Sequence, residues 1–382
     1  MHVIINGWFW DSSTTGSQQY TRRLVQALAT SAPELRISLV TPGRQQQDLP
    51  PSCALHPISC SRSNLGKVWF EQVAFPRACA RLGAHVAHVP YWAPPLRSSV
   101  PVVATIHDLI PLLLQPYRGG PLQRLYTGLV SAGARGATLI LTDSQASRQD
   151  ILTHLQFPPE RVRVIPLAAD AHYAPQPTPE DGEYRAHYGL PHRYVLYLGG
   201  FDVRKNLAGA IATYRWVGPV IGQDCPLVIA GRLPERDTPF TPDPRRLMEE
   251  QGVSAEFVHF TGFVQEAHAP ALYRGAVALI FPSRYEGFGL PPLEALACGT
   301  PVVGSDRASL PEVIGKAGVL LPPDDAEGMA GALIQLIIDE DFRAEMSRRT
   351  LAQSARFSWD RTAQATLAAY KDAINRGTAG DD

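Results

Sequence analysis

Two glutamates eight positions apart flank a short loop in the stretch RYEGFGLPPLEALACGTPVV, residues 284–303. Glu286 precedes the loop, and Glu294 is expected in the first turn of the helix that the Pro-Pro pair opens, because proline fits the start of a helix. Carboxylate oxygens accept strong hydrogen bonds from hydroxyl groups, and free amides at a helix start bind phosphate. A capping role would explain Glu294 but not Glu286. We therefore predict a site for a phosphorylated, hydroxyl-rich ligand, with phosphate on the amides of Gly287, Phe288, Gly289 and Leu290.

Two cations follow another predicted strand end, in YLGGFDVRKNL. Gly200 allows backbone to approach a ligand closely, and Arg204 and Lys205 stand just before Asn206, a favourable N-cap residue. Two cations beside a helix N-terminus suit a diphosphate. The alternative is an ordinary exposed basic turn.

Two junctions in the front half carry further candidates. His107 and Asp108 directly follow a predicted strand in VVATIHDLIPL, and a parallel sheet would place them at its ligand-binding edge. In GWFWDSSTTGSQQYTRR, Gly16 would let the backbone approach a reacting centre. A partly buried structural histidine is the alternative for His107.

Aromatic side chains gather near two predicted strand ends of the front half. Sugar C–H faces pack well on aromatic rings, so these side chains are candidates for stacking on an acceptor sugar. Core or rim packing is the alternative for at least half of them. The residues are Trp8, Phe9, Trp10, Tyr91 and Trp92.

Apolar runs with β propensity alternate with helical patterns, which is typical of parallel sheets with crossover helices. The front half contains the predicted strands MHVIIN, LRISLV, AHVAHVP, PVVATIHD, ATLILTDS and VRVIPLAA. After a Pro-rich polar stretch the pattern restarts with RYVLYLGG, PLVIAGR, FVHFTGFV, VALIFPS and TPVVGSD. We predict an α/β fold of two Rossmann-like doubly wound domains. The predicted boundaries are a first domain at 1–170, a linker at 171–192, a second domain at 193–358, a closing helix at 359–376 and a mobile tail at 377–382.

Composition narrows the class of protein. The 382 residues suffice for two domains, and five cysteines without a C-x-x-C pattern indicate neither a disulfide framework nor a zinc site. No apolar run approaches the ~20 residues of a membrane span, so we expect a cytoplasmic protein. Residues 1–170 hold 15 Lys and Arg against 9 Asp and Glu, which leaves 20 against 27 for the rest. A basic front half would suit peripheral contact with a membrane surface, whereas the basic residues do not interleave with aromatic ones as a nucleic-acid groove requires.

Taken together, these motifs resemble the family 4 retaining glycosyltransferases, enzymes of the two-domain GT-B fold. RKN at 204–206, the glutamate pair with EGFGLPPLEA between and around it, CGTPVVGSD and LPEVIGKAG stand where that family has similar residues. The resemblance implies that ligands bind between the domains and that the closing helix packs back on the first domain. The front loop departs from the family's paired glycines, because it reads TTGSQQY.

The resemblance also implies roles for single residues. Arg204 and Lys205 would neutralise the nucleotide diphosphate, Glu294 would bind the ribose and Glu286 would face the transferred sugar. His107 would lie against the donor sugar, with Gly16 near the diphosphate. The family further implies retention of anomeric configuration, deprotonation of the acceptor by the departing phosphate, and no metal or other cofactor.

IHDLIPLL followed by GGFDVRKNL is similar to members that transfer mannose from GDP-mannose to lipid-linked or surface polysaccharides. A UDP-hexose donor is the alternative within the same class. A GT-B nucleotide-sugar epimerase and a catalytically inactive binding module are the competing functions. A dinucleotide dehydrogenase is excluded, since INGWFWDSS is not the G-x-G-x-x-G that such enzymes need after their first strand.

Overall fold

The computed structural model describes residues 1–11, 16–43 and 49–378. Its chain divides into two compact units, the first made of Met1–Leu167 with Ser358–Asp382 and the second of Ala168–Phe357. Residues 171–192, the predicted linker, lie in the second unit and contain helix α7, Asp181–His187. Most of the predicted mobile tail, 379–382, lies outside the described residues.

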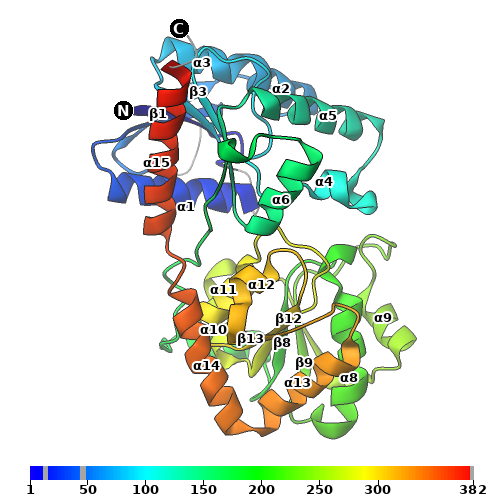
Figure 1. The fold of residues 1–382 in the computed structure, drawn as a ribbon. Helices are drawn as coiled ribbons and strands as arrows, with labels where there is room; N and C mark the ends of the chain where they lie inside the picture. The colour runs from blue at the N-terminus through cyan, green and yellow to red at the C-terminus, as the bar shows by residue number, and fades with distance from the viewer. Residues whose placement is uncertain (12–15, 44–48, 379–382) are drawn as a thin grey trace. The chain divides into compact units, whose positions relative to one another are not determined.

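The described residues of the first unit form a seven-stranded sheet in which every pairing is parallel (Figure 1). Its order is β3-β2-β1-β4-β5-β6-β7, so the direction of strand addition reverses between β1 and β4. Ligands of doubly wound sheets bind at the carboxyl ends of the strands at this switch point. The strands are β1 His2–Asn6, β2 Arg36–Pro42, β3 Cys53–Ile58, β4 Val86–Val89, β5 Val102–Thr105, β6 Leu139–Thr142 and β7 Val162–Val164.

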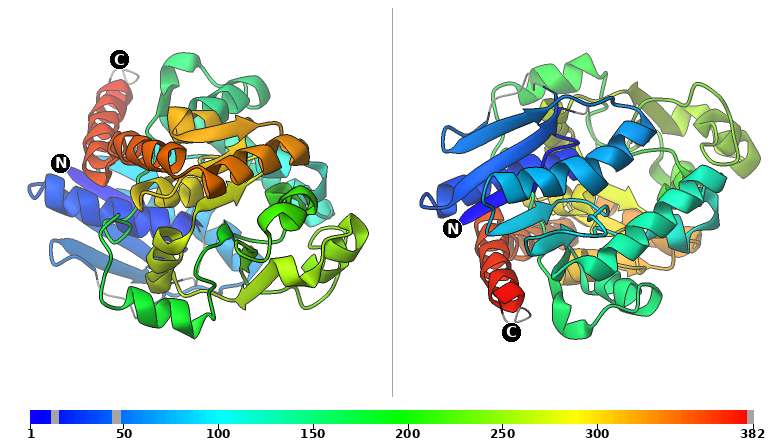
Figure 2. Two further views of the ribbon diagram at one scale, coloured as in Figure 1. Left: turned by 90° about the horizontal axis from the view of Figure 1, so that it is seen from below. Right: turned by 90° about the horizontal axis from the view of Figure 1, so that it is seen from above.

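Helices cover both faces of this sheet (Figure 2). An apolar core that includes Phe70 and Phe75 joins the sheet to the segment α2–α3 and to α5. Ser144 caps α6, because its hydroxyl accepts a hydrogen bond from the amide of Ser147. The helices are α1 Gly16–Ser31, α2 Asn64–Trp69, α3 Phe75–Arg81, α4 Ile110–Leu113, α5 Pro121–Gly136, α6 Gln145–His154 and α15 Trp359–Thr378, with a π-helical segment at Phe70–Ala74 between α2 and α3.

The closing helix α15 packs beside α1 and against β4 and β5 (Figure 1). A buried polar network joins these elements. The ring nitrogens of His88 lie 2.7 Å from the Tyr370 hydroxyl and 2.9 Å from the Thr105 hydroxyl, which also lies 3.0 Å from the hydroxyl of Tyr20. Burial lowers the pKa of His88 to about 3, so this histidine is neutral and α15 is tied to the sheet by uncharged hydrogen bonds.

The described residues of the second unit form a six-stranded parallel sheet in the order β10-β9-β8-β11-β12-β13, with its switch point between β8 and β11. The strands are β8 Val195–Leu198, β9 Leu227–Ala230, β10 Val258–Gly262, β11 Ala278–Phe281, β12 Val302–Ser305 and β13 Gly318–Leu321. Beside α7, the helices are α8 Leu207–Ile221, α9 Pro244–Gln251, α10 Ala269–Gly275, α11 Leu290–Ala297, α12 Leu310–Ile314, α13 Ala326–Ile338 and α14 Glu340–Ser354.

The predicted fold class is confirmed, and all eleven predicted strands are present. Two strands at sheet edges were missed. The strand β3, CALHPI, contains Pro57, which only an edge strand tolerates, and most of it is partly exposed. The strand β13, GVLL, is four residues long and partly exposed throughout. Both lack the long buried apolar run that marks a central parallel strand.

Candidate functional site

Arg204 and Lys205 lie at the switch point of the second sheet, in the loop after β8. Asn206 fixes this loop, because its backbone adopts a left-handed φ of 53° and its side chain accepts a hydrogen bond from the Gly209 amide, capping α8. The same side chain donates to the carbonyls of Pro282 and Pro323, at 3.1 and 2.8 Å. The predicted N-cap is therefore confirmed, and it ties the loop after β8 to the end of β11.

Both cations converge on the carboxylate of Glu286. An Arg204 guanidinium nitrogen lies 2.6 Å from one oxygen, and the Lys205 ammonium lies 2.7 Å from the other. The Ser283 hydroxyl donates to the same carboxylate at 2.7 Å. Burial would raise the pKa of Glu286, but the charges of Lys205 and Arg204 outweigh it and hold the pKa below its usual value. Glu286 is thus a firmly ionised carboxylate.

The cation cluster keeps unused donors. An ammonium group has three N–H donors, and among the described residues Lys205 has one hydrogen-bond acceptor, Glu286. Arg204 also donates to the carbonyl of Tyr285 at 2.9 Å and lies 3.7 Å from Asp202. Gly200 precedes this turn, with its carbonyl accepting from the Tyr197 hydroxyl at 2.9 Å. The arrangement can take an anionic group through Lys205 without first breaking the ion pairs.

The loop between the two glutamates ends in a glycine-only conformation. Gly289 adopts a φ of +106° as the N-cap of α11, and a Cβ there would lie 2.9 Å from Leu310. The Ser309 hydroxyl lies 2.9 and 2.6 Å from the carbonyls of Glu286 and Phe288, which fastens the loop to the start of α12. Carbonyls held in this way point toward the protein. Ser309 has no counterpart in the motif and was missed from the sequence.

The structure corrects the predicted place of Glu294. Helix α11 begins at Leu290, and its first turn contains both prolines but no acidic residue. Glu294 lies one position beyond this turn, where its carboxylate accepts a hydrogen bond from the Tyr273 hydroxyl at 2.9 Å. Burial raises the pKa of Glu294 to about 7. It is held by a phenol rather than by the helix dipole, and Tyr273 is another partner that the sequence did not predict.

His107 lies at the carboxyl edge of the first sheet, as predicted, but its partner is not Asp108. Its Nδ1 lies 2.7 Å from the carboxylate of Asp143, which follows β6, whereas Asp108 accepts a hydrogen bond from the Ile110 amide at 3.0 Å. Burial would lower the pKa of His107, but Asp143 raises it above its ordinary value. The buried Nε2 has no hydrogen-bond partner among the described residues.

Gly16 is the first residue of α1 and is exposed. A Cβ at this position would meet no atom within 4 Å, so packing does not require glycine here. The residues before it, 12–15, lie outside the described part of the chain.

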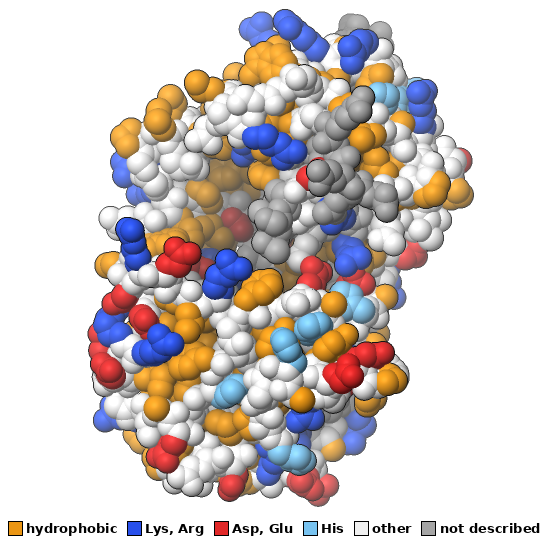
Figure 3. Space-filling view, turned by 180° about the vertical axis from the view of Figure 1, so that it is seen from behind, with side chains coloured by type: hydrophobic (Ala, Val, Ile, Leu, Met, Phe, Trp, Pro, Cys, Tyr) orange, Lys and Arg blue, Asp and Glu red, His pale blue; other side chains and the backbone are white. Residues whose placement is uncertain are grey.

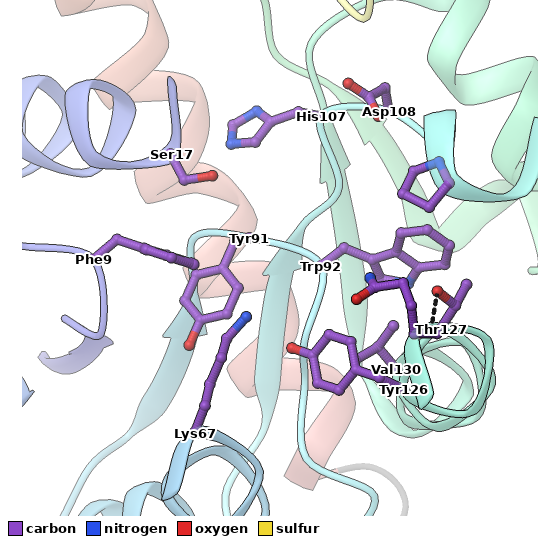
Figure 4. Close-up of a pocket in the computed structure, with 12 residues that line it drawn as sticks. Phe9, Ser17, Lys67, Tyr91, Trp92, His107, Asp108, Tyr126, Thr127 and Val130 are labelled. Carbon is purple, nitrogen blue, oxygen red and sulfur yellow. Dashed lines mark hydrogen bonds between the residues drawn. The ribbon is translucent and has the colours of Figure 1, made fainter. Parts of the chain in front are cut away.

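A pocket of about 270 Å³ opens at the switch point of the first sheet (Figure 4). Phe9 comes from the loop after β1, and Tyr91 and Trp92 from the loop after β4. Of the predicted aromatic candidates, Trp8, Trp10 and Tyr91 are buried, with exposed fractions of 6%, 3% and 5%, whereas Phe9 and Trp92 are partly exposed. The pocket is lined by Phe9, Ser17, Lys67, Tyr91, Trp92, His107, Asp108, Pro111, Gln123, Tyr126, Thr127 and Val130.

Comparison with known proteins agrees with this geometry. Residues 14–173 match the family described as Glycosyltransferase Family 4, and residues 192–339 match Glycosyl transferases group 1. The O-antigen chain mannosyltransferase B of Escherichia coli is 33% identical over 270 residues, which are 70% of this chain and 70% of that protein. The serotype-specific mannosyltransferase WbdA of Escherichia coli is 29% identical over 97% of this chain, which spans about half of WbdA, 48%.

Among solved structures, the sucrose-phosphate synthase of Thermosynechococcus elongatus superposes with a TM-score of 0.76 at 21% identity, over 98% of this chain and 99% of that one. This likeness concerns the fold, and it agrees with the two doubly wound sheets described above. The chain belongs to the family 4 glycosyltransferases and is a glycosyltransferase of the GT-B fold.

Proposed function

We propose that the chain is a retaining, metal-independent hexosyltransferase that moves mannose from GDP-mannose to a saccharide acceptor in the synthesis of a surface polysaccharide. The observation that carries the proposal is the convergence of Arg204 and Lys205 on Glu286 at the switch point of the second sheet. The choice of mannose rests on the two relatives, each of which is a mannosyltransferase by name. A UDP-hexose is the alternative donor.

In this proposal the second unit binds the nucleotide. Arg204 and Lys205 take the charge of the diphosphate, which accumulates as the glycosidic bond breaks, and so do the work that a metal ion does in other transferases. The carboxylate of Glu294 accepts from the ribose hydroxyls, next to the Tyr273 hydroxyl that it already binds. Backbone amides at Gly200 and in the loop Gly287, Phe288, Gly289 and Leu290 contact the phosphates.

The protonation state of Glu286 supports a mechanism without an enzymic base. A carboxylate tied to two cations and held below its usual pKa is a weak proton acceptor. It is also a poor nucleophile, because both oxygens are engaged. We assign it to the hydroxyls of the transferred sugar. The departing phosphate then takes the proton of the acceptor hydroxyl, which forms its bond to the anomeric carbon on the face that the phosphate leaves.

The first unit supplies His107 to the transferred sugar. Since Asp143 holds Nδ1, the unpartnered Nε2 is the ring atom available for a sugar hydroxyl. Gly16, at the exposed start of α1, is assigned to the diphosphate.

A titration with GDP, UDP, GDP-mannose, UDP-glucose and NAD, followed by thermal shift and calorimetry, tests the donor. A ligand that binds the folded state raises its melting point by mass action, so GDP and GDP-mannose are expected to stabilise the protein and NAD to have no effect. Stabilisation by UDP species alone would replace mannose with another hexose. No response to any nucleotide would contradict the proposal. Retention is tested by NMR of the anomeric centre in the product.

Contact with an anionic membrane is a second part of the proposal, and it rests on the surface around α2 and α5. Residues 49–142 hold eight Lys or Arg but only two acidic residues, one of which, Glu71, is buried. Leu65, Leu122 and Leu125 protrude from α2 and α5 with exposed fractions of 83%, 83% and 73%. In Figure 3, hydrophobic side chains protrude along the upper left edge, and basic side chains lie below them. Among the described residues, no helix has the length and apolar character needed to cross a membrane.

Co-sedimentation with vesicles tests this contact. Vesicles containing anionic lipid should retain the protein better than neutral ones, because each Lys or Arg near such a surface contributes about 1 kcal/mol. The double substitution of Leu122 and Leu125 by Ser should reduce binding without changing GDP affinity. Equal binding to both kinds of vesicle would contradict an electrostatic contact.

A further inference from the structure

The pocket of the first unit surrounds an ammonium group with aromatic rings. The Nζ atom of Lys67 lies 5.0 Å from the ring centre of Phe9, 5.6 Å from that of Tyr91 and 4.9 Å from that of Tyr126. In Figure 4 this side chain rises from α2 with its amino group between the two tyrosines. The rings of Phe9 and Tyr126 are partly exposed and leave aromatic surface for a ligand, and the ammonium group supplies hydrogen-bond donors between them.

A buried carboxylate holds Lys67 in this position. Glu71 is fully buried one helical turn further on, with an oxygen 3.6 Å from Nζ. Its two oxygens lie 3.1 and 3.0 Å from the hydroxyl of Tyr126, across on α5. Burial raises the pKa of Glu71 to about 7. The contact joins the π-helical segment after α2, which contains Glu71, to α5, and Lys67 of α2 and Tyr126 of α5 both line the pocket.

The charges around the pocket disfavour an anionic ligand. Both basic side chains that line the pocket already face a carboxylate, because Lys67 lies 3.6 Å from Glu71 and His107 is paired with Asp143. Asp108 is an acidic residue that lines the same pocket. With Glu71 protonated, the charges of Lys67 and Asp108 balance, and with Glu71 ionised the pocket has an excess of negative charge. A neutral ligand is therefore preferred in either state.

The pocket also holds a polar atom that lacks a partner. The indole Nε1 of Trp92 is buried and has no hydrogen-bond acceptor among the described residues. A buried donor without an acceptor costs free energy until a ligand supplies one. A volume of about 270 Å³ is near the lower end of the range of small-molecule pockets, which begins at about 300 Å³, so the space suits a single sugar ring.

We propose that this pocket binds the terminal, uncharged pyranose of the acceptor, with Lys67 and the Trp92 indole donating to its hydroxyls and the partly exposed rings of Phe9 and Tyr126 packing on its C–H faces. Glu71 acts as a positioning residue through Lys67. The identification of this sugar as the acceptor rests on the proposed function, whereas the preference for a neutral pyranose rests on the pocket alone.

Saturation-transfer NMR with simple sugars tests the pocket directly. The probes are methyl α-mannopyranoside and methyl β-glucopyranoside as neutral rings, and mannose 6-phosphate and glucuronic acid as anionic ones, each with the full chain saturated with GDP. We expect transfer to at least one neutral ring and at least fivefold less to the anionic sugars. A stronger signal from an anionic sugar, or none from either neutral ring, would overturn the proposal.

Variants separate the pocket from the rest of the molecule. Lys67→Met should reduce the signal of the neutral ring at least fivefold, whereas Lys371→Met, at an exposed lysine of α15, should leave it unchanged. Trp92→Phe keeps an aromatic ring and should lose about half of the signal, which provides a second reading if Lys67→Met folds poorly. An unchanged signal in both pocket variants refutes the subsite. GDP affinity should stay at the wild-type value in each variant. If the proposed donor is wrong, the protein will not bind GDP, whether or not the pocket binds a sugar.

Discussion

The two sheets end in sites of opposite character. At the switch point of the first sheet, one ammonium group lies among aromatic rings, with carboxylates nearby that balance its charge. At the switch point of the second, two cations meet on one carboxylate, and Lys205 retains donors for a further anion. The same topology thus provides a neutral aromatic pocket in one unit and a charged cluster in the other. The side chains on the loops, rather than the sheet, decide which class of ligand each unit can hold.

The largest effects are expected from breaking the charged cluster. Glu286→Ala and Lys205→Ala should each reduce the rate of sugar transfer at least ~100-fold, as loss of a well-placed transition-state contact does. Lys316→Ala, at an exposed lysine of the same unit, is the matched control and should transfer at the wild-type rate. Thermal melting verifies that each variant is folded. Turnover close to wild type in either cluster variant would refute the site assignment.

A smaller effect should separate the two regions by ligand. Arg204→Ala is expected to weaken GDP binding about tenfold, because it removes a charge-assisted hydrogen-bond donor. Trp92→Phe, in the aromatic pocket, should not change GDP affinity. Calorimetry of both variants measures the difference. Equal losses in the two variants would mean that the regions do not differ in the ligand they bind.

The two glutamates of the motif should differ in their effect on stability. The folded-state pKa of Glu294, about 7, lies above its ordinary value of 4.5. Such a group favours the folded state less as pH rises between these values, because the unfolded chain ionises more readily. The stability of Glu294→Gln relative to wild type should therefore increase by about 1 kcal/mol of unfolding free energy between pH 5 and pH 8. One pKa unit corresponds to roughly 1.4 kcal/mol, and the partial exposure of Glu294 reduces the effect. Urea denaturation at both pH values measures this gain. A stability difference between Glu294→Gln and wild type that is the same at both pH values would mean that the pKa of Glu294 is not raised in the folded protein.

The smallest expected effect concerns a single imidazole. Asp143 holds the pKa of His107 above its ordinary value against the opposing influence of burial. In Asp143→Asn burial acts without this charge, so the pKa of His107 should fall by about one unit or more. An NMR titration of the ring of His107 measures the shift. An unchanged pKa would show that Asp143 does not control the ring.

The sequence predicts the charged cluster better than the aromatic pocket for a physical reason. Arg204, Lys205 and Asn206 are adjacent, and Glu286 directly precedes a loop that contains Gly289, whose φ is positive. Because these residues are close to one another along the chain, the sequence shows both motifs. The pocket is built from α1, α2, α4, α5 and the loops after β1, β4 and β5, which are distant from one another along the chain. Lys67 looks like any surface lysine until Glu71 and the rings are placed around it.

The sequence also does not predict the hydrogen-bond partners that lie far away along the chain. Nothing in the spacing of His107 and Asp143 links them, because adjacent strands of the sheet bring them together. The same holds for Glu294 and Tyr273, which lie on different helices. The strands themselves were predictable, because buried parallel strands form continuous apolar runs. Only the two edge strands β3 and β13, which lack such runs, were not predicted.

The position of α15 has a consequence for synthesis of the chain. This helix completes the first unit, yet 190 residues of the second unit, Ala168–Phe357, are translated before it. At roughly 5–20 residues per second, the ribosome would need on the order of 10–40 seconds to deliver it. During that interval His88 lacks the Tyr370 hydroxyl that binds it in the finished protein. The first unit therefore cannot be completed before the end of the chain is made, and a premature stop codon shortly before α15 would leave the first unit unfinished while the second unit is whole.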